Sequence, residues 1–193
     1  GRKLGRHRSG GRAAISCEVR IFDALGKELP RGEVGEVAVR GPGVMMGYWN
    51  KPAETAAAVR DGWMFTGDGG RMDADGYVYI VDRIKDMIVT GGENVYSAEV
   101  ESAVATHAAV AQCAAIGVPN DQWGELVHVF IVRKPGQALT QEQVIAHCKE
   151  RIAGYKCPRQ VSFIDAMPLS GAGKILKTSL RAPFWEGRAR KVA

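Results

Sequence analysis

The stretch from Gly76 to Glu101 constrains the fold of this 193-residue chain more than any other. Tyr77 to Val81 alternates aromatic and β-branched residues, as a half-buried strand does. The alternation stops at Asp82, where four charges fall within five positions, and a strand pattern resumes over Met87 to Thr90. A glycine pair and then Ser97, a predicted helix N-cap, follow. The stretch therefore predicts a strand, a charged joint, a second strand, a glycine turn and a helix start.

Before the charged joint, the pattern predicts a small β module. Strands are expected over Ile15–Phe22 and Glu36–Arg40, with a hairpin-like turn at Asp23–Lys27 between them. Their apolar side chains alternate, so Val19, Ile21, Val37 and Val39 are expected to share buried faces. A short alanine-rich helix is expected to begin near Pro52.

After the joint, helices and strands alternate. The expected elements are helices over Ser97–Thr106 and Gln141–Arg151 and strands over Val110–Val118, Leu126–Arg133 and Val161–Asp165. Thr140 with Gln143 fits a capping box at the start of the second helix. The sequence thus predicts an α+β fold with a domain boundary at Arg83–Lys85, dividing a basic flexible segment (1–14) and a β module (15–84) from an α+β domain (85–193).

The net charge of +5 is concentrated at the two ends of the chain. Residues 1–12 carry five basic residues and no acid, residues 181–193 contribute +3, and the body between them is left at −3. Basic ends on a mildly acidic body are typical of solvated tails. We therefore expect no nucleic-acid partner.

Cysteine and histidine spacing argues against a metal centre. The four cysteines form no CxxC pair and the four histidines form no ligand-spaced cluster, so the sequence predicts neither a metal site nor a disulfide framework. The longest apolar runs are shorter than the roughly 20 residues of a membrane helix, and no apolar signal segment is visible. These patterns predict a cytoplasmic protein without a transmembrane segment.

Three motifs follow one another in a characteristic order: Trp63–Asp68 (WMFTGD), Gly76–Glu101, and Pro168–Lys177 (PLSGAGKILK). In this order the chain resembles the adenylate-forming superfamily, which includes acyl-CoA synthetases, peptide-synthetase adenylation domains and beetle luciferases. The resemblance covers nearly the whole chain from about Val19. It implies that 15–84 is the last β subdomain of the large AMP-binding domain and that 85–193 is the small, mobile α+β C-terminal domain.

The resemblance assigns two nucleotide-binding residues and a hinge. Gly67-Asp68 after an aromatic strand is by itself typical of a turn, but the matching aspartate of the family accepts hydrogen bonds from the ribose hydroxyls of ATP. A carboxylate suits this task because each of its oxygens can accept from one of two vicinal hydroxyls. Arg83, which could also be half of a surface ion pair, matches an arginine near the ribose and phosphates. Lys85 matches the hinge position about which the C-terminal domain rotates.

Gly91 and Gly92 have two interpretations of equal weight. A glycine pair commonly ends a strand in a turn. The matching glycines of acyl-CoA synthetases line the tunnel for the pantetheine arm of coenzyme A, where a Cβ would obstruct a thin ligand. Both a turn and a tunnel wall favour glycine, so the residues alone leave the choice open.

Lys174 is the predicted catalytic residue. Its glycine-rich loop is not a Walker A motif, which would need glycine at Pro168 and serine or threonine at Ile175. It resembles the mobile loop whose lysine reaches the reacting carboxylate and the α-phosphate, where a cation offsets developing negative charge. Lys177, one helical turn further on, is expected to face solvent.

The implied activity is that of a fatty-acid or aryl carboxylate–CoA ligase, an AMP-forming acid–thiol ligase. ATP and a carboxylate would give an acyl-adenylate, and coenzyme A would then displace AMP to form a thioester. A serine- and threonine-rich phosphate loop, the Thr-Glu motif that would hold Mg2+ and the acyl pocket are not found in these residues, so the ligands of Mg2+ are expected in an N-terminal part. On this interpretation the chain alone adenylates nothing.

Two alternatives to the ligase interpretation remain. The chain could be a non-catalytic module that complements a separate N-terminal half, in which case residues 15–65 should expose apolar surface. A basic nucleic-acid binder is the other alternative, and it would bind DNA in a salt-sensitive way through residues 1–12. The acyl substrate and the oligomeric state do not follow from the sequence.

Overall fold

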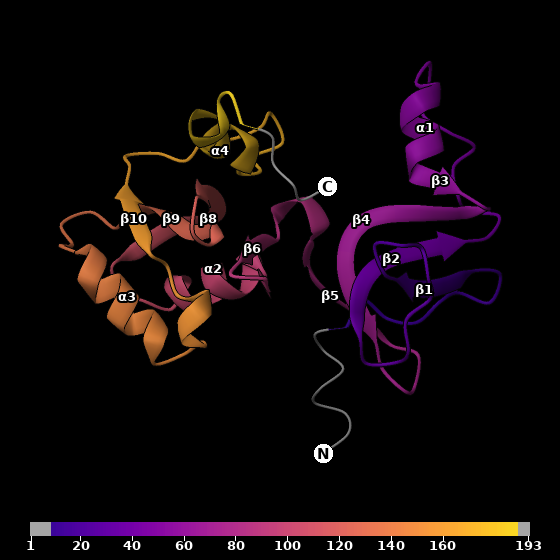
Figure 1. The fold of residues 1–193 in the computed structure, drawn as a ribbon, viewed down its shortest axis with the longest axis horizontal. Coiled ribbons are helices and arrows are strands. Elements are labelled where there is room, and N and C mark those ends of the chain that lie inside the picture. Colours follow the sequence, from indigo (N-terminus) through magenta and orange to yellow (C-terminus); the bar gives the residue numbers. More distant parts are fainter. Residues whose placement is uncertain (1–8, 189–193) are drawn as a thin grey trace. The chain divides into compact units, whose positions relative to one another are not determined.

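The structure is a computed structural model that describes residues 9–188. The chain divides into two compact units, Gly1–Ile84 and Lys85–Ala193. Each unit has its own sheet and its own hydrophobic core, so each is described by itself. The predicted α+β class is confirmed (Figure 1).

The first unit is an antiparallel sheet with one short helix (Figure 1). Its elements are β1 (Glu18–Phe22), β2 (Val34–Arg40), α1 (Pro52–Ala58), β3 (Val59–Arg60), β4 (Trp63–Met72) and β5 (Val78–Arg83). The strand order is β1-β2-β4-β3, and β5 also pairs with β4. The long strand β4 is therefore the centre of the sheet, bordered by β2 on one edge and by β3 and β5 on the other.

The four apolar residues predicted to share buried faces lie opposite one another in β1 and β2. Val19 lies opposite Val39 and Ile21 opposite Val37 in the β1–β2 ladder. Ile21 and Val37 are buried in the core of this unit together with Met72 and Val78, whereas Val19 and Val39 are half-buried. Alternation along two neighbouring strands therefore predicted the inner face of the sheet.

Part of the segment predicted to be flexible pairs with β5. The amide of Gly10 donates to the carbonyl of Val78 at 2.8 Å, and the amide of Val78 donates to the carbonyl of Gly11 at 2.9 Å. Residues 1–8 of that predicted segment lie outside the described residues. In the described part, backbone hydrogen bonds place the chain along the sheet edge.

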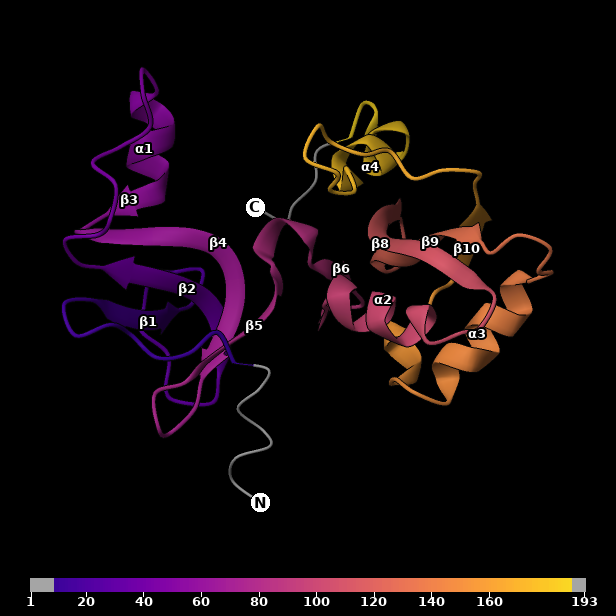
Figure 2. The same cartoon turned by 180° about the vertical axis from the view of Figure 1, so that it is seen from behind.

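The second unit is a mixed sheet with helices on both faces (Figures 1 and 2). Its elements are a 3₁₀ turn (Ile84–Asp86, which begins on the last residue of the first unit), β6 (Ile88–Thr90), β7 (Glu93–Val95), α2 (Ser97–Ala105), β8 (Val110–Asn120), β9 (Gly124–Arg133), α3 (Gln141–Lys149), a 3₁₀ turn (Gly154–Lys156), β10 (Gln160–Phe163) and α4 (Lys177–Trp185). The order is β10-β9-β6-β7, with β8 paired to β9. Helices α2 and α3 cover one face and α4 covers the other.

Strand β9 shows why this sheet needs two layers of helices. Val127, Val129 and Ile131 point into the core shared with α2 and α3. Phe130 points to the opposite face, where it packs in the cluster that contains Leu180 of α4. Because both faces of β9 are apolar, a helix on one side alone would leave the other side exposed to water.

His128 is a buried polar residue on the α4 face of β9. Its ring stacks on Phe130 at 4.7 Å between centroids and meets the edge of Phe184, and its Nε2 lies 2.9 Å from Ser162 Oγ. Burial lowers the pKa of His128. The imidazole therefore acts as a neutral aromatic residue of the core.

The helix starts distinguish a correct prediction from a wrong one. The capping box at Thr140 and Gln143 is confirmed, with hydrogen bonds of 2.9 and 3.3 Å in the two directions. Ser97 was expected to be the N-cap of α2, but the N-cap is Tyr96. Ser97 is instead the first helical residue, it is fully buried, and its hydroxyl accepts from Lys177. The Ser97 hydroxyl therefore bonds a side chain that is distant in sequence, and it does not cap α2.

Candidate functional site

Thr66, Gly67 and Asp68 form a bulge within strand β4. Ala38 of β2 pairs with Phe65 and Glu36 pairs with Gly69, so three residues of β4 oppose one residue of β2. Thr66 Oγ1 donates to the carbonyl of Val37 at 2.8 Å, and the amide of Gly67 donates to Glu36 Oε1 at 2.9 Å. The motif is therefore a braced bulge in a strand, and the simple turn considered from the sequence is not found. Bulges commonly redirect a side chain beside a binding site.

The bulge places Asp68 against Arg83. The two residues are directly opposite in the β4–β5 ladder, and Arg83 Nε lies 2.7 Å from Asp68 Oδ1. The ion pair considered for Arg83 from the sequence is therefore found, and its partner is Asp68. The arginine side chain is 55% exposed and that of Asp68 29%. A pair this exposed contributes little to stability.

Lys85 lies in the 3₁₀ turn Ile84–Asp86, directly after β5. Lys85 is the first residue of the second unit, since the division between the units falls between Ile84 and Lys85. The residue is exposed. A position where two compact units meet along the chain is where a hinge can act with few contacts to break.

Gly91 and Gly92 form the two-residue turn between β6 and β7. Both have positive φ, 59° and 83°, as the favoured two-residue hairpin turns require. The Gly91 amide donates to the carbonyl of Trp123 at 2.8 Å, and a Cβ on Gly91 would lie 2.9 Å from Cε3 of the Trp123 ring. The turn therefore explains the glycine pair structurally, and Gly91 also allows close approach of an aromatic ring.

A cavity of about 430 Å³ opens beside this turn in the second unit. Gly92, Val89 and Trp123 line it near the turn, and Trp185 and Arg188 line it from the C-terminal end of α4. Trp123 was not singled out from the sequence. The sequence feature that could have indicated it is an aromatic residue next to Gly124, in the turn between two predicted strands.

Substitution of the two glycines is expected to separate backbone strain from contact with Trp123. Gly91→Ala and Gly92→Ala should each cost about 1 to 2 kcal/mol, because alanine is strained at positive φ. Only Gly91→Ala should also displace the Trp123 ring, since nothing lies within 4 Å of a Cβ on Gly92. Denaturation would measure the first effect, and the NMR shift of the Trp123 indole N–H the second. Equal indole shifts in the two variants would contradict the close contact.

Lys174 lies in a tightly hydrogen-bonded loop. Leu169 and Ile175 form a β-bridge, and the amide of Leu176 donates to the carbonyl of Pro168 at 2.8 Å. The Ser170 amide donates to the Lys174 carbonyl at 2.8 Å, and the Lys174 amide lies 3.1 Å from Ser170 Oγ. Lys174 itself is exposed. The loop thus presents one exposed cation from a closed backbone frame.

The expectation that Lys177 faces solvent is wrong. Its side chain is 15% exposed, and its Nζ lies 2.7 Å from both Ser97 Oγ and Glu101 Oε1 of α2. Helix α4, which begins at Lys177, was not predicted at all. The spacing of Leu176, Leu180 and Phe184 by four residues was the signal that would have indicated it.

The predicted site residues are thus distributed over both units. Asp68 and Arg83 are brought together in the first unit, Gly91 and Gly92 form one turn in the second, and Lys174 lies on a separate loop of the second.

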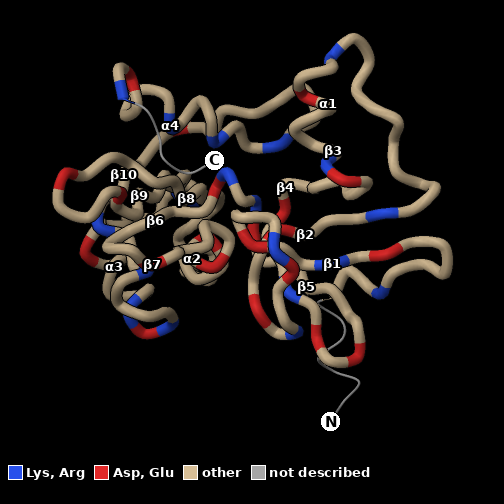
Figure 3. Tube along the Cα trace, turned by 45° about the vertical axis from the view of Figure 1, so that its right-hand side comes forward, with Lys and Arg blue, Asp and Glu red and all other residues tan. Residues whose placement is uncertain are grey.

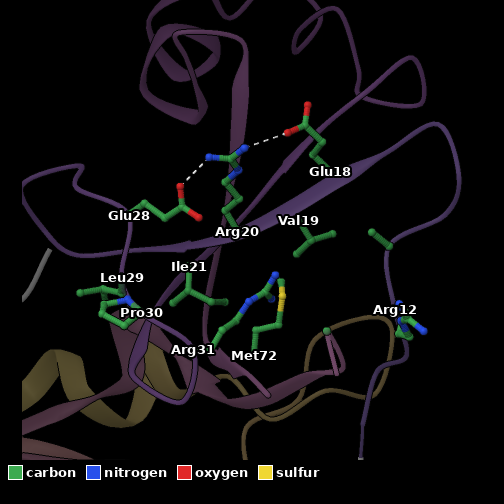
Figure 4. A pocket seen from close by; sticks show the side chains of 12 residues that line it. Arg12, Glu18, Val19, Arg20, Ile21, Glu28, Leu29, Pro30, Arg31 and Met72 are labelled. Carbon is green, nitrogen blue, oxygen red and sulfur yellow. Dashed lines mark hydrogen bonds and ion pairs between the residues drawn. The ribbon is translucent and has the colours of Figure 1, made fainter. Parts of the chain in front are cut away.

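The first unit also contains a cavity that includes no predicted site residue. It has a volume of about 410 Å³ and is lined by charged and apolar residues of β1 and the chain around it (Figure 4). Arg20 bridges two carboxylates there, Glu18 and Glu28. The guanidinium of Arg20 is therefore already paired with carboxylates of the same unit.

Figure 3 shows acidic and basic residues interspersed along both units. Among residues 9–188, no group of three or more His, Cys, Asp or Glu residues could hold a metal ion. In the same part of the chain, no helix is both long and apolar enough to span a membrane.

Two family models match the chain. The model of the AMP-binding enzyme C-terminal domain matches residues 99–174, and that of the AMP-binding enzyme matches residues 2–49. These matches cover segments of the second and first units, respectively.

Curated relatives extend this similarity over most of the chain. Feruloyl-CoA synthase of an Amycolatopsis species is 44% identical over 176 residues, which are 91% of this chain and 36% of that protein. The medium/long-chain-fatty-acid–CoA ligase FadD8 of Mycobacterium tuberculosis is 45% identical over 190 residues, 94% of this chain and 33% of the relative. The long-chain-fatty-acid–CoA ligase of Yersinia pestis is 47% identical, covering 91% of this chain and 32% of the ligase.

Solved structures show the same fold. ATP-bound MatB from Rhodopseudomonas palustris has a TM-score of 0.84 and 39% identity, covering 92% of this chain and 36% of MatB. The o-succinylbenzoate CoA synthetase MenE of Bacillus subtilis, in complex with the acyl-adenylate intermediate, has a TM-score of 0.86 and 36% identity, with the same coverage of both chains. The chain belongs to the adenylate-forming superfamily. It spans about a third of the length of the curated relatives it matches.

Proposed function

We propose that this chain is the C-terminal portion of an acyl-CoA synthetase that uses ATP to convert a carboxylate into an acyl-adenylate and then into a thioester. The observation that carries the proposal is the 44 to 47% identity with CoA ligases over about nine-tenths of the chain. The roles below are inferred from the family resemblance and from the geometry of the described residues. A cytoplasmic location is part of the same proposal.

Asp68 and Arg83 are the proposed nucleotide-binding pair. The bulge in β4 fixes Asp68, and Arg83 Nε contacts one carboxylate oxygen at 2.7 Å. The carboxylate can accept hydrogen bonds from ribose hydroxyls, each worth about 1.5 to 3 kcal/mol when the acceptor is charged. The exposed guanidinium can stabilise phosphate charge from the same site.

Lys174 is the proposed catalytic residue for adenylation. Attack of a carboxylate on the α-phosphate brings two anions together, and a positioned ammonium group stabilises the charge that develops. Rotation at Lys85 would then withdraw Lys174 and bring in the face that carries Gly91 and Gly92. Mg2+ would supply further charge neutralisation at the phosphates, and its ligands are proposed to lie outside the residues described here.

Coenzyme A is the proposed acceptor of the acyl group. The cavity of about 430 Å³ that Gly92 and Trp123 line is the proposed passage for the pantetheine arm. Other acceptors occur among similar proteins, since one relative is a fatty acid–[acyl-carrier-protein] ligase and one solved structure is an amide bond synthetase. A comparison of thiol and amine acceptors would therefore decide this point.

The test of the proposed function is a chimera in which residues 1–193 follow the N-terminal two thirds of the feruloyl-CoA synthase. We expect ferulate-dependent pyrophosphate release and, with coenzyme A, a feruloyl thioester. The N-terminal two thirds alone and residues 1–193 alone should both be inactive. A folded chimera no more active than its N-terminal part would contradict the proposal.

A second candidate is a module that complements a separately encoded N-terminal part. The observation that favours it is exposed apolar surface in the first unit. Ile15, Leu25, Met46 and Trp49 are each at least 88% exposed. Mixing residues 1–193 with the separate N-terminal part should then restore activity without a covalent link, and failure of the two to associate would exclude this candidate.

A further inference from the structure

Helix α4 is attached to the rest of the second unit through two shielded ion pairs. The first is at its first residue, Lys177, whose Nζ contacts Ser97 and Glu101. These two residues are four positions apart on α2 and therefore lie on the same face of that helix. Ser97 is fully buried, and the Glu101 side chain is 24% exposed.

The half-buried Glu101 has further contacts with strand β8. Its Oε1 also accepts from the amide of Ala115 in β8 at 2.8 Å, and Cys113 of the same strand lies against the backbone carbonyl of Glu101. Burial, followed by the Glu101 carboxylate, raises the pKa of Cys113 to about 12. Lys177 therefore joins three elements, α4, α2 and β8, through one carboxylate.

The second ion pair is one turn further along α4. Arg181 Nη2 lies 2.8 Å from Asp86 Oδ1, with side chains 11% and 14% exposed. Asp86 directly follows Lys85, the proposed hinge. Arg181 Nε is buried without a hydrogen-bond partner among the described residues, so this arginine is held in place at a cost. No residue of either ion pair is among the proposed nucleotide-binding or catalytic residues.

The loop that carries Lys174 is short, and backbone hydrogen bonds join its two ends just before α4 begins. The bridge between Leu169 and Ile175 and the hydrogen bond from Leu176 to Pro168 fix the base of the loop. Ile175 also packs against the core cluster under α4. Only two residues, Ile175 and Leu176, separate Lys174 from Lys177, so the position of Lys174 depends on where α4 is anchored.

We propose that Lys177 and Arg181 are positioning residues that couple the Lys174 loop to the hinge. Lys177 fixes the start of α4 on α2, and Arg181 fixes its next turn on Asp86 beside Lys85. Movement at Lys85 is thereby transmitted to Lys174 as rotation of one rigid body. The catalytic role of this movement rests on the proposed function. The anchoring of α4 by the two ion pairs does not, because it is observed in the described residues.

Rigid transmission matters because adenylation depends on placement of the cation. Displacement of a catalytic group by about 1 Å can cost roughly 10²-fold in rate. A loop that moved independently of the hinge would reach the reacting carboxylate in only a fraction of rotations. Two ion pairs shielded from water are less affected by salt screening than surface pairs, so the coupling should persist at physiological ionic strength.

The first test is hydrogen exchange on the 193-residue chain. Lys177→Met should raise exchange of amides in residues 170–180 by roughly tenfold or more and leave β9 unchanged. Lys134→Met, at an exposed position after β9, is the matched control and should change neither. If Lys177→Met fails to fold, the double variant Lys177→Met with Glu101→Gln removes both charges and should show the same local effect. Unchanged exchange in a folded variant would overturn the proposal.

The second test uses the chimera and separates positioning from stability. Lys177→Met should lower kcat for ferulate-dependent pyrophosphate release by about tenfold or more with little change in KM for ATP. Lys177→Arg, which keeps the charge, should restore most of kcat. A purely structural role would instead lower the amount of folded enzyme without changing kcat per folded molecule, and that result would overturn the assignment.

The two tests distinguish failure of the proposed function from failure of the positioning role. An inactive wild-type chimera would count against the proposed function, and hydrogen exchange would still decide whether Lys177 anchors the loop. An active wild-type chimera with full adenylation by Lys177→Met would overturn the positioning role and leave the proposed function intact.

Discussion

Replacing Lys174 by alanine is expected to lower carboxylate-dependent pyrophosphate release by the chimera about 10² to 10³-fold, the usual effect of removing one preorganised donor from a developing anion. The physical reason is that the carboxylate and the α-phosphate are both negative. The loss should be in kcat, because a group that acts mainly in the transition state contributes little to ground-state binding. Initial rates of pyrophosphate release at saturating ATP would measure it.

The same variant should leave the second half-reaction almost unchanged. If Lys174 is withdrawn before coenzyme A reacts, thioester formation from preformed feruloyl-adenylate should stay within a few-fold of the unmodified chimera. Lys134→Ala is the matched control for removal of a lysine and should leave both half-reactions intact. Equal losses in the two half-reactions would contradict a role confined to adenylation.

Replacing Arg181 by methionine is expected to destabilise the second unit by about 3 kcal/mol, as removal of one partner from a buried ion pair usually does. Methionine is close in length to the buried stem of arginine, so the packing around this side chain should change little. The cost arises because Asp86, 14% exposed, would be left with a carboxylate that has lost its cation. Native-state hydrogen exchange of β9 amides would measure the opening free energy of this unit.

Arg188→Met is the matched control for Arg181→Met. Arg188 pairs with Asp121 at 3.4 Å, but the two side chains are 56% and 95% exposed. Water screens such a pair, and its loss should cost less than about 1 kcal/mol. Similar destabilisation by the two variants would show that burial of the Arg181–Asp86 pair contributes nothing to its strength.

Local patterns predicted those features whose physics is local. Alternation in β1 and β2 predicted the inner face of the first sheet because side chains on a strand alternate whatever lies beyond them. The capping box at Thr140 and Gln143 was predictable for the same reason, since all its atoms lie within one helical turn. The motifs around Asp68, Arg83 and Lys174 indicated the family.

Features that depend on a distant partner were not predicted correctly. Ser97 fits an N-cap by its neighbours, yet its hydroxyl accepts from Lys177, which is 80 positions away. Lys177 fits an exposed lysine by its neighbours, yet α2 supplies Glu101 to pair with it. Neither partner is visible in the local pattern, because the fold alone brings α4 onto α2.

The sequence by itself determined the α+β class and the family. Its glycine and charge patterns also indicated which residues to examine. The tertiary structure decided that Asp68 projects from a bulge against Arg83, that Gly91 lies under Trp123, and that α4 is anchored by Lys177 and Arg181. The physical reason is that propensities and periodicity act over a few residues, whereas ion pairs, bulges and shielded contacts exist only once strands and helices distant in sequence have packed together.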